Sequence, residues 1–82
     1  MKRTKLSELE EKQKCRVIDI NLEGETKYRL LDMGIIPNTE IEITKKAPLG
    51  DPIQIFLRGY SISIRKEIAR KIEVEVEKWF LH

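Results

Sequence analysis

The sequence contains very few of the side chains that build disulfides, metal centres and catalytic sites. Its 82 residues include one cysteine, Cys15, and one histidine, His82. A single thiol excludes an intrachain disulfide and any zinc site made only of cysteines within one chain. His82 is the last residue, where a side chain is poorly placed for general-base catalysis. We therefore expect a protein of a reducing compartment that has no catalytic residues and is not an enzyme.

The sequence also lacks the usual motifs for nucleotide hydrolysis and for acid–base catalysis. There is no Gly-x-x-x-x-Gly-Lys-Ser/Thr loop, so nucleotide hydrolysis is expected of a partner and not of this chain. Carboxylates alternate at Glu73, Glu75 and Glu77, but this pattern predicts the outer face of a strand, without the apolar pocket that an acid–base pair needs. A solvated strand face is the better interpretation of these three residues.

Long apolar segments and a strong net charge are absent as well. The longest uninterrupted apolar run is Trp79-Phe80-Leu81, far shorter than the roughly 20 residues that cross a bilayer. Charged residues follow Met1 closely, where a signal peptide would need its apolar region. The formal charge is only +2 and aromatic residues are few, which argues against a nucleic-acid surface. We expect a cytoplasmic protein that neither inserts into membranes nor binds nucleic acid.

What the sequence does contain is a series of short apolar segments separated by Gly, Pro and Asn. Residues 39–44 place Ile41 and Ile43 on one face and polar residues on the other, which is the period of a half-buried strand. Residues 53–57 alternate in the same way and return at 62–64 after a tight turn, which predicts a hairpin. About five strands are predicted in all, at residues 15–22, 39–44, 53–57, 62–64 and 72–76.

Helical spacing is confined to two short segments, residues 25–33 and residues 65–70. Gly34 suits the left-handed position that ends the first of these helices. Because closing a small barrel removes exposed strand edges, the expected fold class is mainly β with short helices. We predict one SH3-like β-barrel domain of about five strands that spans residues 1–82.

Two details of the barrel follow from the apolar pattern. The doublet Val17-Ile18 interrupts the alternation of the first predicted strand and indicates a β-bulge. Ile55, Ile62 and Val74 are predicted to point into the barrel.

Several blocks of the sequence resemble a known family. They are Arg-Leu-Leu-Asp-Met-Gly-Ile-Ile-Pro at 29–37, Ala-Pro-Leu-Gly-Asp-Pro-Ile at 47–53, and Arg-Gly-Tyr-Ser-Ile-Ser-Ile-Arg at 58–65. Together with Leu6 and Leu9, which match an N-terminal Leu-x-x-Leu, they are similar to signature blocks of the ferrous iron transport protein A (FeoA) family. The similarity spans nearly the whole chain.

The resemblance implies a fold and a function. The family has an SH3-like barrel, which also occurs as the C-terminal domain of iron-dependent repressors related to the diphtheria toxin repressor. The implied function is that of a cytoplasmic accessory protein that binds and modulates the GTPase region of a GTP-dependent ferrous-iron membrane transporter. The alternative is a metal-responsive regulator module related to those repressor domains.

The chain departs from the family at two turns. Lys12 stands where the family often has glycine, and because lysine adopts a positive φ at a cost, the first loop is expected to differ. Pro37-Asn38 replaces a common Pro-Gly, but asparagine tolerates a positive φ and can still form a type II turn.

The candidate partner-binding residues form two groups. Leu49, Gly50 and Asp51 lie between two prolines, and Leu49 is either tucked under its loop or offered to a partner. Trp79 and Phe80 form the second apolar group, which marks a partner contact, self-association into a homo-oligomer, or a packed tail.

Arg65, Cys15 and the scarce metal ligands are the other candidates for binding or chemistry. Arg65 is expected to cap carbonyl groups or hold a carboxylate rather than to bind a partner. Cys15 lies between two basic residues, yet a small buried thiol is the commoner outcome than a reactive one. No metal-ligating residues and no cofactor are assigned, because tight sites combine several thiolate or imidazole ligands. Carboxylates, or His82 between molecules, would hold Fe²⁺ or Zn²⁺ only weakly.

Overall fold

The computed structural model of the protein describes residues 2–76. Its strands are β1 (Lys2–Lys5), β2 (Lys14–Ile20), β3 (Glu40–Lys46), β4 (Ile53–Leu57), β5 (Tyr60–Ile64) and β6 (Ile72–Val76). The α-helices are α1 (Glu25–Asp32) and α2 (Lys66–Ala69), and two 3₁₀ turns are η1 (Leu6–Glu8) and η2 (Pro48–Gly50). The mainly β fold with short helices is confirmed.

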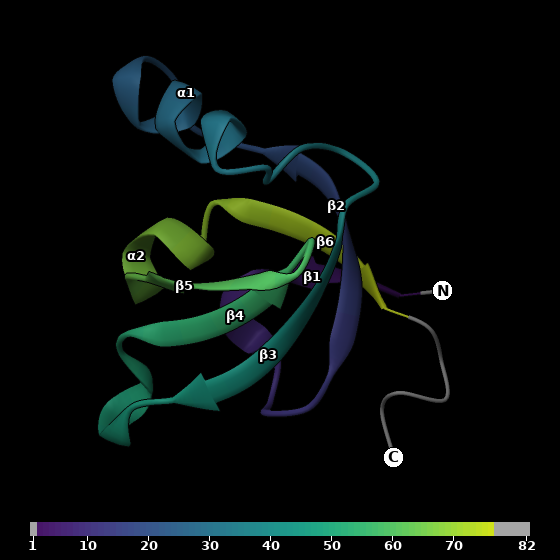
Figure 1. The fold of residues 1–82 in the computed structure, drawn as a ribbon, viewed down its shortest axis with the longest axis vertical. Helices are drawn as coiled ribbons and strands as arrows, with labels where there is room; N and C mark the ends of the chain where they lie inside the picture. Colours follow the sequence, from purple (N-terminus) through teal and green to yellow (C-terminus); the bar gives the residue numbers. More distant parts are fainter. Residues whose placement is uncertain (1, 77–82) are drawn as a thin grey trace.

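The strands form one antiparallel sheet in the order β1-β6-β2-β3-β4-β5. Figure 1 shows that the sheet curls around the middle of the molecule, with α1 at one end of the long axis and the turn after β3 at the other. The edge strands β1 and β5 do not pair with each other. Instead η1, which follows β1, contacts α2, which follows β5, and these turns help to close the barrel.

The core consists almost entirely of aliphatic side chains from alternate strand positions. Ile55 and Val74 are fully buried, as predicted, whereas Ile62 is only partly buried and packs against the core from its margin. Burial of a Val, Leu or Ile side chain is worth about 1.5 to 3 kcal/mol, so this cluster dominates the stability of a small domain.

Strand β1 is missing from the sequence-based prediction, which therefore counted about five strands where the sheet has six. Its sequence is Lys-Arg-Thr-Lys, which has no apolar alternation, and its register pairs Lys2 with Val76 and Thr4 with Val74 on β6. Only pairing with β6, at the opposite end of the chain, makes this segment a strand.

The predicted local irregularities are confirmed. The register of β2 against β6 shifts between Val17 and Asp19, which is the expected β-bulge. Helix α1 ends at Asp32 with Met33 as its C-cap, and Gly34 follows with a φ of +95°, a conformation that glycine adopts at lower cost than other residues. A second register shift, between Ile43 and Lys45 on β3, was not predicted.

Candidate partner-binding surface

Leu49 stands at the tip of the turn between β3 and β4. Its side chain is 96% exposed, the most exposed of the large hydrophobic residues described. Of the two alternatives for Leu49, the structure therefore has the side chain exposed to solvent and not packed under its loop. Leu49 also adopts a φ of +73°, a left-handed conformation that costs a non-glycine residue about 1 to 2 kcal/mol.

Backbone hydrogen bonds hold the base of this turn. The Gly50 N–H donates to the Ala47 carbonyl at 2.7 Å, and the Ala47 N–H donates to the Pro52 carbonyl at 3.1 Å. Next to them, the Lys46 N–H donates to Glu11 Oε2 at 2.8 Å, which fastens the end of β3 to the loop before β2. Leu49 is thus presented from a well-anchored turn.

Asp51, the third candidate in this loop, interacts within the chain. Its Oδ1 accepts a hydrogen bond from the Lys66 N–H at 3.0 Å and lies 3.8 Å from Nη1 of Arg65. The carboxylate therefore joins the Leu49 loop to the start of α2. The carboxylate-holding role expected of Arg65 is observed, in an ion pair whose members are largely exposed and which contributes little to stability.

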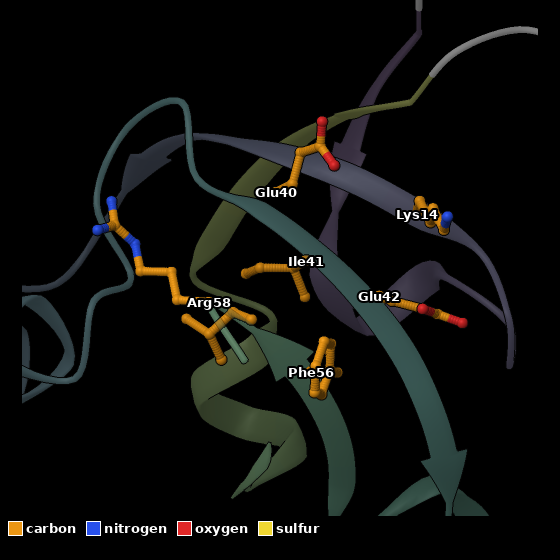
Figure 2. Close-up of a pocket in the computed structure, with 7 residues that line it drawn as sticks. Lys14, Glu40, Ile41, Glu42, Phe56 and Arg58 are labelled. Carbon is orange, nitrogen blue, oxygen red and sulfur yellow. The ribbon is translucent and has the colours of Figure 1, made fainter. Parts of the chain in front are cut away.

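A shallow groove of about 200 Å³ lies on the outer face of the sheet, over β2, β3 and β4. Figure 2 shows Phe56 and Ile41 between Arg58 on one side and Lys14 and Glu42 on the other. Phe56 is 42% exposed, although aromatic side chains are scarce in this chain. One exposed aromatic side chain, Phe56, thus lies among charged side chains in this groove, and aromatic residues with a polar rim are common at protein interfaces.

Sequence reasoning did not select this groove. The available signal was Phe56, which stands among the inward-facing residues Ile53, Ile55 and Leu57 at a position where alternation requires an outward side chain. An aromatic residue at an outward position is unusual enough to mark a candidate contact.

The groove continues into a polar network at the β4–β5 turn. Arg58 Nη2 donates to Thr39 Oγ1 at 3.4 Å, and Thr39 Oγ1 donates to the Gly34 carbonyl at 3.1 Å. The Tyr60 hydroxyl packs over Gly34. This network holds the hairpin against the segment that follows α1.

Cys15 is buried in the core, and desolvation raises the pKa of its thiol to about 12. The thiol is therefore neutral near pH 7 and is not a nucleophile, in agreement with the structural role expected for it.

The remaining expectations concern metals, the tail and membranes. Within residues 2–76, no group of three or more His, Cys, Asp or Glu side chains is placed to hold a metal ion. Trp79, Phe80 and His82 lie outside the described residues, so their roles stay predictions. Nor does the described part of the chain include a helix with the length and apolar character needed to span a bilayer.

The strand arrangement defines a class of protein, the SH3-like small barrels. FeoA of Stenotrophomonas maltophilia, crystallised with zinc and called a procaryotic SH3 domain protein, has the same fold with a TM-score of 0.76 at 22% identity. The match covers 88% of this chain and 89% of that one. The predicted SH3-like fold is confirmed.

The chain belongs to the FeoA domain family, whose model matches residues 4–76. The solution structure of a FeoA-like protein from Clostridium acetobutylicum is 50% identical, with a TM-score of 0.83, and the match covers 93% of this chain and 88% of that chain. The chain is also 35% identical over 72 residues to an Fe(2+) transport protein A/Fe(2+) transporter FeoB fusion protein of Porphyromonas gingivalis. That match covers 88% of this chain but only 8% of the fusion protein.

The similarity to iron-dependent repressors is confirmed as well. IdeR of T. acidophilum matches with a TM-score of 0.81 at 26% identity, over 94% of this chain and 35% of IdeR. The same barrel thus occurs within a longer protein of another kind.

Proposed function

We propose that this protein is an accessory and regulatory protein of ferrous-iron uptake that acts from the cytoplasm. It binds the cytoplasmic GTPase region of a GTP-dependent ferrous-iron membrane transporter and modulates that transporter. The observation that carries the proposal is the Porphyromonas gingivalis fusion, in which a domain 35% identical to this chain shares one polypeptide with an Fe(2+) transporter. Fusion gives two domains a high effective concentration for each other, which favours pairs that associate.

Leu49 supports a role in binding. A large apolar side chain that is 96% exposed and held at a positive φ adds nothing to the core and costs backbone energy. Such a residue is expected where a partner covers it. The anchored turn also favours binding, because it lowers the conformational entropy that is lost when the partner binds. The groove at Phe56 is a second surface of suitable chemistry.

Modulation in this proposal occurs through binding alone. Hydrolysis of GTP belongs to the transporter, and this chain contributes neither a catalytic residue nor a cofactor. Iron is the cargo of the transporter and is not a resident ligand of the barrel.

The second candidate function is a metal-responsive regulator module, and the similarity to IdeR favours it. The two functions differ in their neighbours. A transporter gene beside the gene for this chain supports the first function, whereas a DNA-binding domain encoded in or beside it supports the second.

The direct test is calorimetric titration of the full chain with the cytoplasmic region of the transporter from the same genome. We expect saturable binding and a changed rate of GTP hydrolysis. Leu49→Glu should weaken binding by about tenfold or more, because it places a charge at an apolar contact. Tyr28→Glu is the matched control, since Tyr28 is 67% exposed on α1, at the other end of the molecule (Figure 1).

Absence of binding by the wild-type chain at about 100 μM would exclude the proposed function. Unchanged affinity of a folded Leu49→Glu variant would remove Leu49 from the contact. A chain truncated after Lys78 tests Trp79 and Phe80 in the same assay and in sizing experiments, where lost affinity or a smaller oligomer assigns them an interface.

A further inference from the structure

Strand β5 is an edge of the sheet that lacks the usual protection. It pairs with β4 on one side, and no described strand pairs with its other side. Its sequence, Tyr-Ser-Ile-Ser-Ile, contains no charge and no proline, and its register against β4 has no bulge. Charged residues, prolines and bulges are the devices that keep edge strands from pairing with other chains. The opposite edge, β1, has such protection, because three of its four residues, Lys2, Arg3 and Lys5, are basic.

The register identifies which backbone groups of β5 are free. Leu57 pairs with Tyr60 across the two-residue turn Arg58-Gly59, and a turn of this kind is closed by a hydrogen bond between its first and fourth residues. Hydrogen-bonded and non-hydrogen-bonded pairs then alternate along the ladder. Ser61 and Ser63 occupy the non-hydrogen-bonded positions, so their N–H and C=O groups point away from β4.

Nothing in the described part of the chain satisfies these groups. Neither Ser61 nor Ser63 takes part in a backbone hydrogen bond from a turn, loop or cap among residues 2–76. Both residues are exposed, and Ile62 between them is partly exposed. Water reaches the edge, and an extended segment can replace that water with a ladder of backbone hydrogen bonds.

Cationic side chains flank this edge at both ends. Arg58 precedes β5, while Arg65, Lys66 and Arg70 follow it around a hollow of about 420 Å³ that also includes Asp51 and Glu67. Asp51 is already engaged by Arg65 and by the Lys66 N–H. Among the described residues, Arg58, Lys66, Arg70 and Glu67 form no ion pair, although Arg58 donates a hydrogen bond to Thr39, so positive charge exceeds negative charge around β5. The ends of β5 therefore favour acidic groups.

These charges disfavour a second copy of the chain as the occupant. In an antiparallel pairing that sets Ser61 of one copy opposite Ser63 of the other, the turn with Arg58 in each copy comes near the start of α2, with Lys66, in the other copy. Like charges opposite each other destabilise a strand pair. The edge is better matched to a different protein.

We propose that β5 is a β-augmentation site, which binds an extended segment of a partner protein. The segment carries alternating apolar side chains that contact the exposed part of Ile62, and acidic side chains at both ends. Lys66 Nζ lies 3.9 Å from the point where a Cβ would stand on Gly50, so the end of β5 adjoins the Leu49 loop and the two form one surface. Only the identity of the partner, as the transporter that supplies this segment, rests on the proposed function.

The probe is the blocked peptide Glu-Asp-Val-Thr-Val-Thr-Asp-Glu, titrated into ¹⁵N-labelled full chain. We expect the amides of Ser61 and Ser63 to shift and to exchange with solvent about tenfold more slowly, while the Ile62 amide, which faces β4, changes little. A peptide with lysine in place of each acidic residue should bind at least about tenfold more weakly. This measurement needs no variant, so it does not depend on the folding of one.

Ser63→Pro removes an outward N–H and places a ring at the edge, a position where proline is compatible with a strand. It should lower peptide affinity by about tenfold or more, while Ser63→Ala, which keeps the N–H, should stay within about twofold. Unchanged affinity of a folded Ser63→Pro, or shifts that avoid Ser61 and Ser63, would overturn the site. Protection of these amides without peptide in a concentration-dependent dimer would overturn the choice of occupant.

Failure of this site and failure of the proposed function give different results. If the transporter's cytoplasmic region binds the wild-type chain but the peptide does not bind at β5, the edge site is wrong and the function stands. If the peptide binds at β5 but the transporter region does not bind the wild-type chain, the site stands and the function is wrong.

Discussion

The hydroxyl of Tyr60 lies 3.0 Å from the point where a Cβ would stand on Gly34. The β4–β5 hairpin therefore packs directly on the residue that ends α1, and Gly34 combines this close approach with a φ of +95°. Gly59 is a natural comparison, since its φ is +89° and no atom lies within 4 Å of its Cβ position.

We expect Gly59→Ala to cost about 1 to 2 kcal/mol through backbone strain alone. Gly34→Ala should cost more than this, by about 1 kcal/mol, because the Tyr60 hydroxyl must also give way. Urea unfolding of the two variants measures the difference. Equal losses of stability would mean that the Tyr60 contact yields without cost.

Lys12 adopts a φ of +75°, the left-handed conformation that lysine reaches only at a cost. The expected difference between this loop and that of the family stays a prediction. Lys12→Gly should stabilise the protein by about 0.5 to 1 kcal/mol, since relief of strain exceeds the entropy that glycine loses on folding. Asn38→Gly is the control, because Asn38 also has a positive φ, +76°, which asparagine tolerates. A thermal melt in which Asn38→Gly gains as much as Lys12→Gly would contradict this account.

The stability lost on replacing each of the three residues predicted to point inward with alanine should follow how deeply that residue is buried. Ile55→Ala and Val74→Ala should each cost about 2 to 4 kcal/mol, because both side chains are fully buried and leave cavities. Ile62→Ala should cost about 1 kcal/mol, since Ile62 is partly exposed at the edge strand. A loss for Ile62→Ala as large as that for Ile55→Ala would place Ile62 in the core.

Cys15 should make stability depend on pH in the alkaline range. Burial raises its thiol pKa from 9.0 to about 12, so the protonated thiol is favoured in the folded state. Its contribution is complete below pH 9, and it is lost as pH rises from about 9 towards 12, because the unfolded state releases its proton first. The melting temperature of wild type, minus that of Cys15→Ala, should therefore fall between pH 9 and pH 11. A constant difference would show that the thiol titrates normally.

Metal affinity should be weak. Residues 2–76 contain no cluster of metal-ligating side chains, and we expect no one-to-one Fe²⁺ site tighter than about micromolar in the monomer. Anaerobic calorimetry checks this directly. A stoichiometric site with a much lower Kd would require ligands from the segment beyond Val76, where His82 is the first residue to replace.

Local sequence patterns determine much of this fold. Alternation placed Ile41, Ile43 and Ile55 on inward faces, because a strand repeats every two residues and a core excludes polar groups. Gly34 marked the end of α1 for a similar reason, since a left-handed backbone conformation favours glycine whatever the rest of the fold is. The blocks that resemble the FeoA family contain the same alternating apolar residues and turn glycines.

The candidate surfaces required the tertiary structure. Leu49 in a Pro/Gly-rich loop was compatible with either exposure or burial, and the packing around the loop decided for exposure. The groove at Phe56 and the open edge of β5 depend on which strands become neighbours. By itself the sequence determined the faces of the strands and the positions of the turns, because their causes lie within a few residues. Only the tertiary structure decided that Lys-Arg-Thr-Lys forms a strand and that Tyr-Ser-Ile-Ser-Ile is left at an edge, because strand pairing joins residues far apart in the chain.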